Sequence, residues 1–142
     1  MTRPPEQTPE IRAVLDRSAL QSYARGHVHV GELLIDIADE KASIAIPAAA
    51  FGDAHAAALE NEHARALLRL LTTLPGTAVL KLDAEAASSM AGTFVVTNGD
   101  MARAHAVWAA NKHNALYLTT EPDEVKFLVP ADNVHPIPTE DA

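Results

Sequence analysis

Residues of types that bind metal ions stand close to the ends of apolar runs. Asp16 closes the run at residues 11–16, and Glu121 follows the run at 115–119. Asp53 lies in an alanine-rich segment between them. Converging carboxylate oxygens are the ligands that a hard cation such as Mg²⁺ prefers. If the fold brings these three acids together, they could hold a divalent cation.

The elements that must position these acids alternate along the chain. Apolar runs predict short strands, and apolar residues at helical spacing predict helices. The expected strands are residues 11–16, 43–46, 77–82, 115–119 and, as an edge strand, 133–137. The expected helices are 18–25, 29–41, two within 48–74 that are separated near 60–62, one that begins at Asp83, and 101–112. This alternation predicts an α/β fold: a single three-layer domain with a central parallel sheet of four to five strands and helices on both faces.

Such a sheet would bring several candidate residues to one edge. The carboxyl ends of parallel strands meet there, and ligands bind beyond them. Asp16, Thr119 and Glu121 would lie at this edge. Asp53 would lie about two turns into the helix that leaves the second strand. The predicted topology therefore supports a shared site.

Four motifs, taken in order, resemble those of one family. Residues 14–20 (VLDRSAL) resemble the opening motif of PIN domains, the metal-dependent ribonuclease fold used by VapC-type toxins. Pro47 with Asp53 six residues later is similar to the family's second acidic position. Residues 105–110 (HAVWAA) are similar to its Asp-Ala-x-Ile-Ala-Ala helix, and 118–121 (LTTE) to its strand-end Thr-x-Asp/Asn. The resemblance runs from about residue 12 to about residue 137.

This resemblance implies a site, a reaction and partners. In the family, four acids bind one or two Mg²⁺ or Mn²⁺ ions, which activate water for attack on an RNA phosphate. The catalytic positions implied in this chain are Asp16, Asp53, His105 and Glu121. Metal binding is implied for Asp16, Asp53 and Glu121, with Ser18, Thr119 and Asp100 beside them. The resemblance also implies an RNA substrate, a homodimer and an antitoxin protein as partner.

Three of the four acidic positions depart from the family pattern. Asp53 replaces the usual Glu, and Glu121 stands where Asp or Asn is usual. His105 replaces an Asp, which removes a negative charge and suits Mn²⁺ or Zn²⁺ better than Mg²⁺. Asp100 cannot replace it within one helix, because five residues place it about 140° away around the axis. His105 would therefore bind the metal or transfer a proton, since its ordinary pKa lies near neutrality.

The same residues also have ordinary structural interpretations. Ser18 suits the N-cap of the first predicted helix, and Asp100 suits that of the last. His105 fits a hydrogen-bonded histidine of the core. The remaining acids could end a strand or lie in solvent.

Three hypotheses of function follow. The first is a PIN-like, Mg²⁺- or Mn²⁺-dependent endoribonuclease, which would be the toxin of a toxin–antitoxin pair. The second is a PIN-like domain that has lost catalysis and serves as a binding or dimerisation module. The third is an α/β domain that binds a small molecule or nucleotide at the same strand ends.

The composition limits these alternatives. A chain of 142 residues fits one domain at 11–138, with 1–10 as a flexible lead-in and 139–142 as an acidic tail. The absence of cysteine excludes disulfides, thiolate metal sites and cysteine catalysis. A net charge of −8 argues against a broad basic surface for nucleic acid, and no apolar run is long enough for a membrane span. We expect a cytoplasmic protein whose dimer surface uses the leucine-rich residues 67–74 and the N-terminal helices.

Overall fold

The central sheet has five strands that all run in the same direction. The computed structural model describes residues 9–139. Its strands are β1 (Ile11–Leu15), β2 (Ser43–Pro47), β3 (Thr77–Leu80), β4 (Leu116–Thr119) and β5 (Val134–Pro136). They lie in the order β3-β2-β1-β4-β5, and every neighbouring pair is parallel. The predicted α/β fold with a parallel sheet is confirmed.

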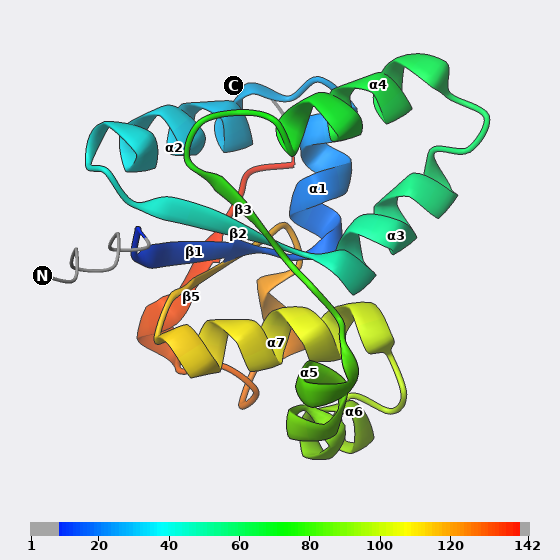
Figure 1. The fold of residues 1–142 in the computed structure, drawn as a ribbon, viewed down its shortest axis with the longest axis vertical. Coiled ribbons are helices and arrows are strands. Elements are labelled where there is room, and N and C mark those ends of the chain that lie inside the picture. Colours follow the sequence, from blue (N-terminus) through cyan, green and yellow to red (C-terminus); the bar gives the residue numbers. More distant parts are fainter. Residues whose placement is uncertain (1–8, 140–142) are drawn as a thin grey trace, which may run out of the picture.

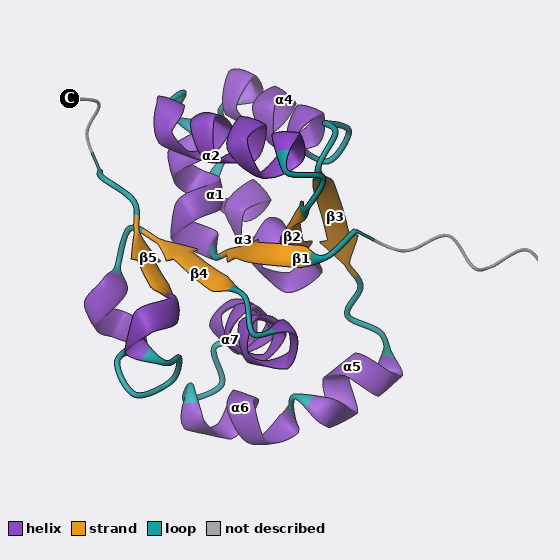
Figure 2. Cartoon of the chain, turned by 90° about the vertical axis from the view of Figure 1, so that its left-hand side faces the viewer, coloured by secondary structure: helices purple, strands orange, loops and turns teal. Residues whose placement is uncertain are grey.

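Helices cover both faces of this sheet, as Figures 1 and 2 show. One face carries α1 (Arg17–Ala24), α2 (Val28–Asp39), α3 (Ala48–Ala57) and α4 (Glu62–Leu71). The other face carries α5 (Ala84–Ser89), α6 (Ala91–Val96) and α7 (Met101–His113). Two short 3₁₀ turns, η1 (Pro122–Val125) and η2 (Ala131–Asn133), connect β4 to β5. The three predicted layers are therefore present.

The strands are apolar on both faces because both faces are covered. Leu15, Ile44 and Leu118 pack under α1, α2 and α4, whereas their neighbours Val14, Ala45 and Tyr117 pack on α7. The α7 helix approaches the sheet through alanines, of which Ala106, Ala109 and Ala110 are buried. Small side chains let the helix axis lie close to the sheet.

The predicted elements agree with the observed ones to within one or two residues, with one exception. The segment that follows Asp83 forms two short helices, α5 and α6, that meet at Met90. The predicted lead-in at 1–10 and tail at 139–142 lie largely outside the described residues. Within 9–139, none of the helices has the length and apolar character that crossing a bilayer demands.

Candidate functional site

Asp16 lies at the carboxyl edge of the sheet and is buried. It directly follows β1, and its side chain is 4% exposed. Its Oδ1 accepts hydrogen bonds from the Ala19 amide at 2.8 Å and from the Ser18 hydroxyl at 2.6 Å. Asp16 is therefore the N-cap of α1. The prediction that Ser18 caps this helix is wrong, because Ser18 donates its proton to the cap.

Ser18 instead joins β1 to β4 through a buried hydrogen-bond network. Its Oγ accepts from the Thr120 amide at 2.9 Å and lies 3.2 Å from the Thr119 hydroxyl. Since the single Ser18 proton goes to Asp16, the Thr119 hydroxyl must be the donor to Ser18. The Thr119 Oγ1 in turn accepts from the Glu121 amide at 2.9 Å. This network fixes the start of the chain segment that leaves β4.

Arg17 pairs with two of the other acids. Its Nη1 donates to Asp53 Oδ2 on α3 at 2.6 Å, and its Nη2 donates to Asp100 Oδ2 at 3.2 Å. The hydrogen bond from Asp53, with the charges of both carboxylates, raises the pKa of Arg17 against the opposing effect of partial burial. One guanidinium therefore holds together two acids that come from different elements.

Arg103, on the first turns of α7, pairs with two acids that follow β4. Its Nη2 lies 3.2 Å from Glu121 Oε2, and its Nη1 lies 3.6 Å from Glu124 Oε2. The Arg103 side chain is 18% exposed, whereas its partners are 47% and 61% exposed. Glu121 is thus drawn toward α7 by a positive charge of the protein itself.

Asp100 has both of the roles that the sequence left open. Its Oδ1 accepts from the Arg103 amide at 3.1 Å, which makes it the N-cap of α7 as predicted. Its Oδ2 faces Arg17 and so belongs to the same group as Asp53. It lies at the helix end and not on the face that carries His105.

His105 is fully buried and has a structural role. Its Nδ1 accepts a hydrogen bond of 3.3 Å from the Ala49 amide, in the first turn of α3. The N-cap of that helix is Pro47, which offers no side-chain acceptor. His105 therefore satisfies a free amide of α3 from a different helix. Burial lowers the pKa of His105, so its imidazole is neutral at pH 7.

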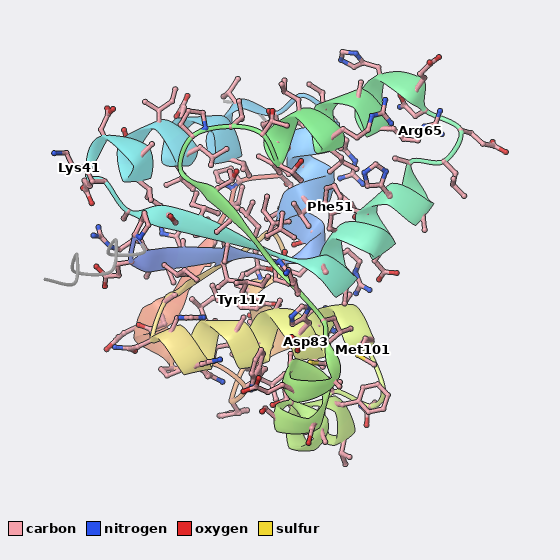
Figure 3. All side chains as sticks on the ribbon, in the orientation of Figure 1. Lys41, Phe51, Arg65, Asp83, Met101 and Tyr117 are labelled. Carbon is pink, nitrogen blue, oxygen red and sulfur yellow. The ribbon has the colours of Figure 1, made fainter. Side chains whose placement is uncertain are left out.

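Tyr117 completes the buried side of the site. Its ring lies between the sheet and α7, as Figure 3 shows, and its hydroxyl is buried without a hydrogen-bond partner. Burial and the charge of Asp16 raise the pKa of Tyr117, so the phenol stays protonated. Tyr117, Arg17 and Arg103 line one small pocket with Asp16, Ser18 and Glu121, and this pocket has no room for a water molecule.

Sequence reasoning missed these three lining residues. Arg17 stands next to Asp16, and Arg103 stands one turn from the predicted cap Asp100, so both positions were open to inspection. Their positive charges signal that nearby acids need a partner. Tyr117 gave no such signal, because its alternating position in β4 is that of an ordinary core residue.

The arrangement does not fit a divalent cation as it stands. The Asp16 Oδ1 serves two donors, Asp53 serves Arg17, and Glu121 serves Arg103. His105 is committed to α3. Among residues 9–139, no group of three or more histidines and acids is placed to hold a metal ion. The absence of water-sized space also gives a small-molecule ligand no room at these strand ends.

Comparisons with known proteins support the fold and go no further. No protein-family model and no curated protein matches the chain. Among solved structures, it is similar to PAE2754 from Pyrobaculum aerophilum, with a TM-score of 0.58 and 16% sequence identity. The similarity covers 85% of this chain and 88% of that one. At this identity the two proteins share a fold, and the likeness carries no activity across.

Proposed function

We propose that this chain is a PIN-like domain that has lost the metal-dependent chemistry of that family and acts as a binding module. The observation that carries the proposal is the pairing of Arg17 with Asp53 and Asp100, and of Arg103 with Glu121. A guanidinium supplies the positive charge that these carboxylates would otherwise take from a metal ion. It cannot lower the pKa of a bound water as a metal does, so it does not replace the metal in catalysis.

The environment of His105 supports the same proposal. A ligand or proton-transfer group must reach the metal or the substrate. His105 is buried, neutral and hydrogen-bonded to the backbone of α3. The position at which the family pattern has an acid is therefore used to hold two helices together.

A second candidate function is a metal-dependent endoribonuclease of the toxin type, with Mg²⁺ or Mn²⁺, RNA and an antitoxin partner. The observation that favours it is the partial exposure of the ion pairs. The Asp53 side chain is 45% exposed, and exposed pairs with arginine contribute about 0–1 kcal/mol. A divalent cation could then compete with Arg17 for the same oxygens.

Metal binding and RNA cleavage distinguish the two candidates. Mn²⁺ and Mg²⁺ are titrated calorimetrically into the wild type, into the double variant Arg17→Met/Arg103→Met, and into the control Arg69→Met. Arg69 is an exposed arginine on α4, away from the site. We expect no binding by the wild type or the control at concentrations up to about 1 mM. We expect the double variant to bind Mn²⁺, because Asp53, Asp100 and Glu121 have then lost their cationic partners.

Wild-type protein should also leave labelled single-stranded RNA intact with either metal. The proposal is wrong if the wild type binds Mn²⁺ or Mg²⁺ and Asp53→Asn abolishes that binding. Cleavage of RNA that depends on the metal and on Asp53 would establish the second candidate instead.

A further inference from the structure

The loop between β4 and β5 presents an aromatic side chain to solvent. Val125 and Val129 anchor the loop, since both are buried in the core cluster on the α7 side of the sheet. Phe127 lies between these anchors and is 100% exposed. The loop is therefore fixed at two points while its largest side chain contacts nothing in its own chain.

The backbone at Phe127 is strained. Its φ is +67°, in the left-handed region that side chains with a Cβ rarely adopt. Asn98 and Asn114 also have positive φ, and asparagine tolerates this region well. A bulky aromatic residue does not, and a glycine at this position would avoid the cost. Strain of this kind indicates a function for the side chain when the fold itself does not use it.

An apolar hollow lies directly beside Phe127. It has a volume of about 740 Å³, which is large enough for an aromatic side chain. Its apolar lining comes from Pro122, Leu128, Val129, Pro130 and Val134, with Phe127 itself. The same surface thus carries a projecting ring and a hollow that such a ring could fill.

The charges around the hollow are balanced. The exposed Asp123 and Lys126 both line it and have opposite signs. Glu124 is turned toward Arg103. In a chain with a net charge of −8, this patch is close to neutral, so two copies can approach each other here with little repulsion.

We propose that this loop is a self-association surface, on which Phe127 of one copy enters the hollow of a second copy. A two-fold axis would place the second copy's Phe127 in the first copy's hollow, because an isologous contact uses the same patch twice. The same axis would set Lys126 of one copy against Asp123 of the other. This assignment does not rest on the proposed function, since a nuclease with this loop would associate in the same way.

The surface differs from the one that the sequence favoured. In the leucine-rich residues 67–74, Leu68 and Leu71 are buried in the core of the same chain and cannot meet a partner. Leu70 is exposed on α4 but has no hollow beside it. The loop patch offers both parts of a self-complementary contact.

Sedimentation equilibrium of the full chain between about 1 and 300 µM tests the proposal, because a contact of this small size gives a weak dimer. We expect a monomer–dimer equilibrium for the wild type. Phe127→Gly should weaken it by about tenfold or more, as loss of an aromatic anchor does. The control Val95→Ser removes an exposed apolar residue of α6 and should leave it unchanged. A thermal melt should show that Phe127→Gly is at least as stable as the wild type, since it relieves the strained φ.

Charge exchange tests the two-fold arrangement separately. Lys126→Glu and Asp123→Lys should each weaken dimerisation, whereas the double variant should restore it to within about threefold of the wild type. The proposal is overturned if the wild type is monomeric throughout, if Phe127→Gly associates as tightly as the wild type, or if the double exchange fails to restore association.

Discussion

The candidate site has a buried half and an exposed half, and the two are held together by different forces. In the buried half, Asp16, Ser18 and Thr119 form short hydrogen bonds to one another and to backbone amides. In the exposed half, Asp53 and Glu121 form ion pairs with arginines. The first set lies out of water, and the second set is open to solvent and salt.

This difference decides what each half contributes. Buried polar groups are costly to leave without a partner, so the network around Asp16 stabilises the junction of β1, α1 and β4. Exposed ion pairs are weak and are screened by salt, so they orient side chains more than they stabilise the fold. The family-like residues of the buried half have therefore a sufficient structural reason to be present. Chemistry, if any remains, depends on the exposed half.

The largest effect is expected when the buried acceptor is removed. Asp16→Ala takes away the N-cap of α1 and leaves the Ala19 amide and the Ser18 hydroxyl without their acceptor. We expect the free energy of unfolding to fall by about 2–3 kcal/mol. Asp16→Asn keeps an oxygen at the cap and should cost about 1 kcal/mol or less. Urea denaturation measures both, and a cost below about 0.5 kcal/mol for Asp16→Ala would contradict the structural role of this half.

A smaller and pH-dependent effect is expected from His105. In the unfolded chain its pKa is about 6.5, and burial lowers the pKa in the folded protein. The unfolded state therefore binds the proton first as the pH falls. The stability linked to His105 is complete above about pH 6.5 and declines below it, by up to about 1.4 kcal/mol per pH unit, until the pH reaches the lowered folded pKa.

The variant His105→Asn isolates this contribution. Asparagine can still accept from the Ala49 amide but does not titrate, so the fall in stability below pH 6.5 should be shallower than in the wild type. His113→Gln is the control, because burial and Lys112 also lower the pKa of His113. Equal slopes for wild type and His105→Asn, measured by urea denaturation at pH 5.5 and 7.5, would show that His105 is not the buried neutral group described above.

The two halves also differ in how far the sequence could predict them. The parallel sheet, its helices and the position of Asp16 at the strand end follow from apolar runs and their order, which are local signals. Asp100 was predicted as the N-cap of α7 for the same reason, and the structure confirms it. The capping role of Asp16 was assigned to Ser18, because either residue type can accept the amide bond and only the φ and ψ angles decide between them.

The partners of the exposed acids could not be predicted in the same way. Arg17 meets Asp53 and Asp100 across 36 and 83 residues of chain, and no local pattern encodes such a contact. The hydrogen bond between His105 and the Ala49 amide depends on how closely α3 and α7 pack, which only the folded chain determines. The resemblance to PIN domains identified the positions but not what each side chain does there, so metal binding by Asp16, Asp53 and Glu121 stays a prediction.

The smallest effect is expected from the arginines, and its dependence on salt separates the two halves most sharply. Arg17→Met keeps the apolar stem of the side chain and removes the charge that pairs with Asp53 and Asp100. In dilute buffer we expect a loss of about 0.5–1 kcal/mol in the free energy of unfolding, and Arg103→Met should cost no more than this. At 1 M NaCl the screening length falls to about 3 Å, so the cost of Arg17→Met should nearly vanish. The cost of Asp16→Ala should stay the same in both buffers, because hydrogen bonds to a buried cap are not exposed to the ions. A cost of Arg17→Met that persists in 1 M NaCl would instead place Arg17 with the buried network, and the exposed half would then be as rigid as the other.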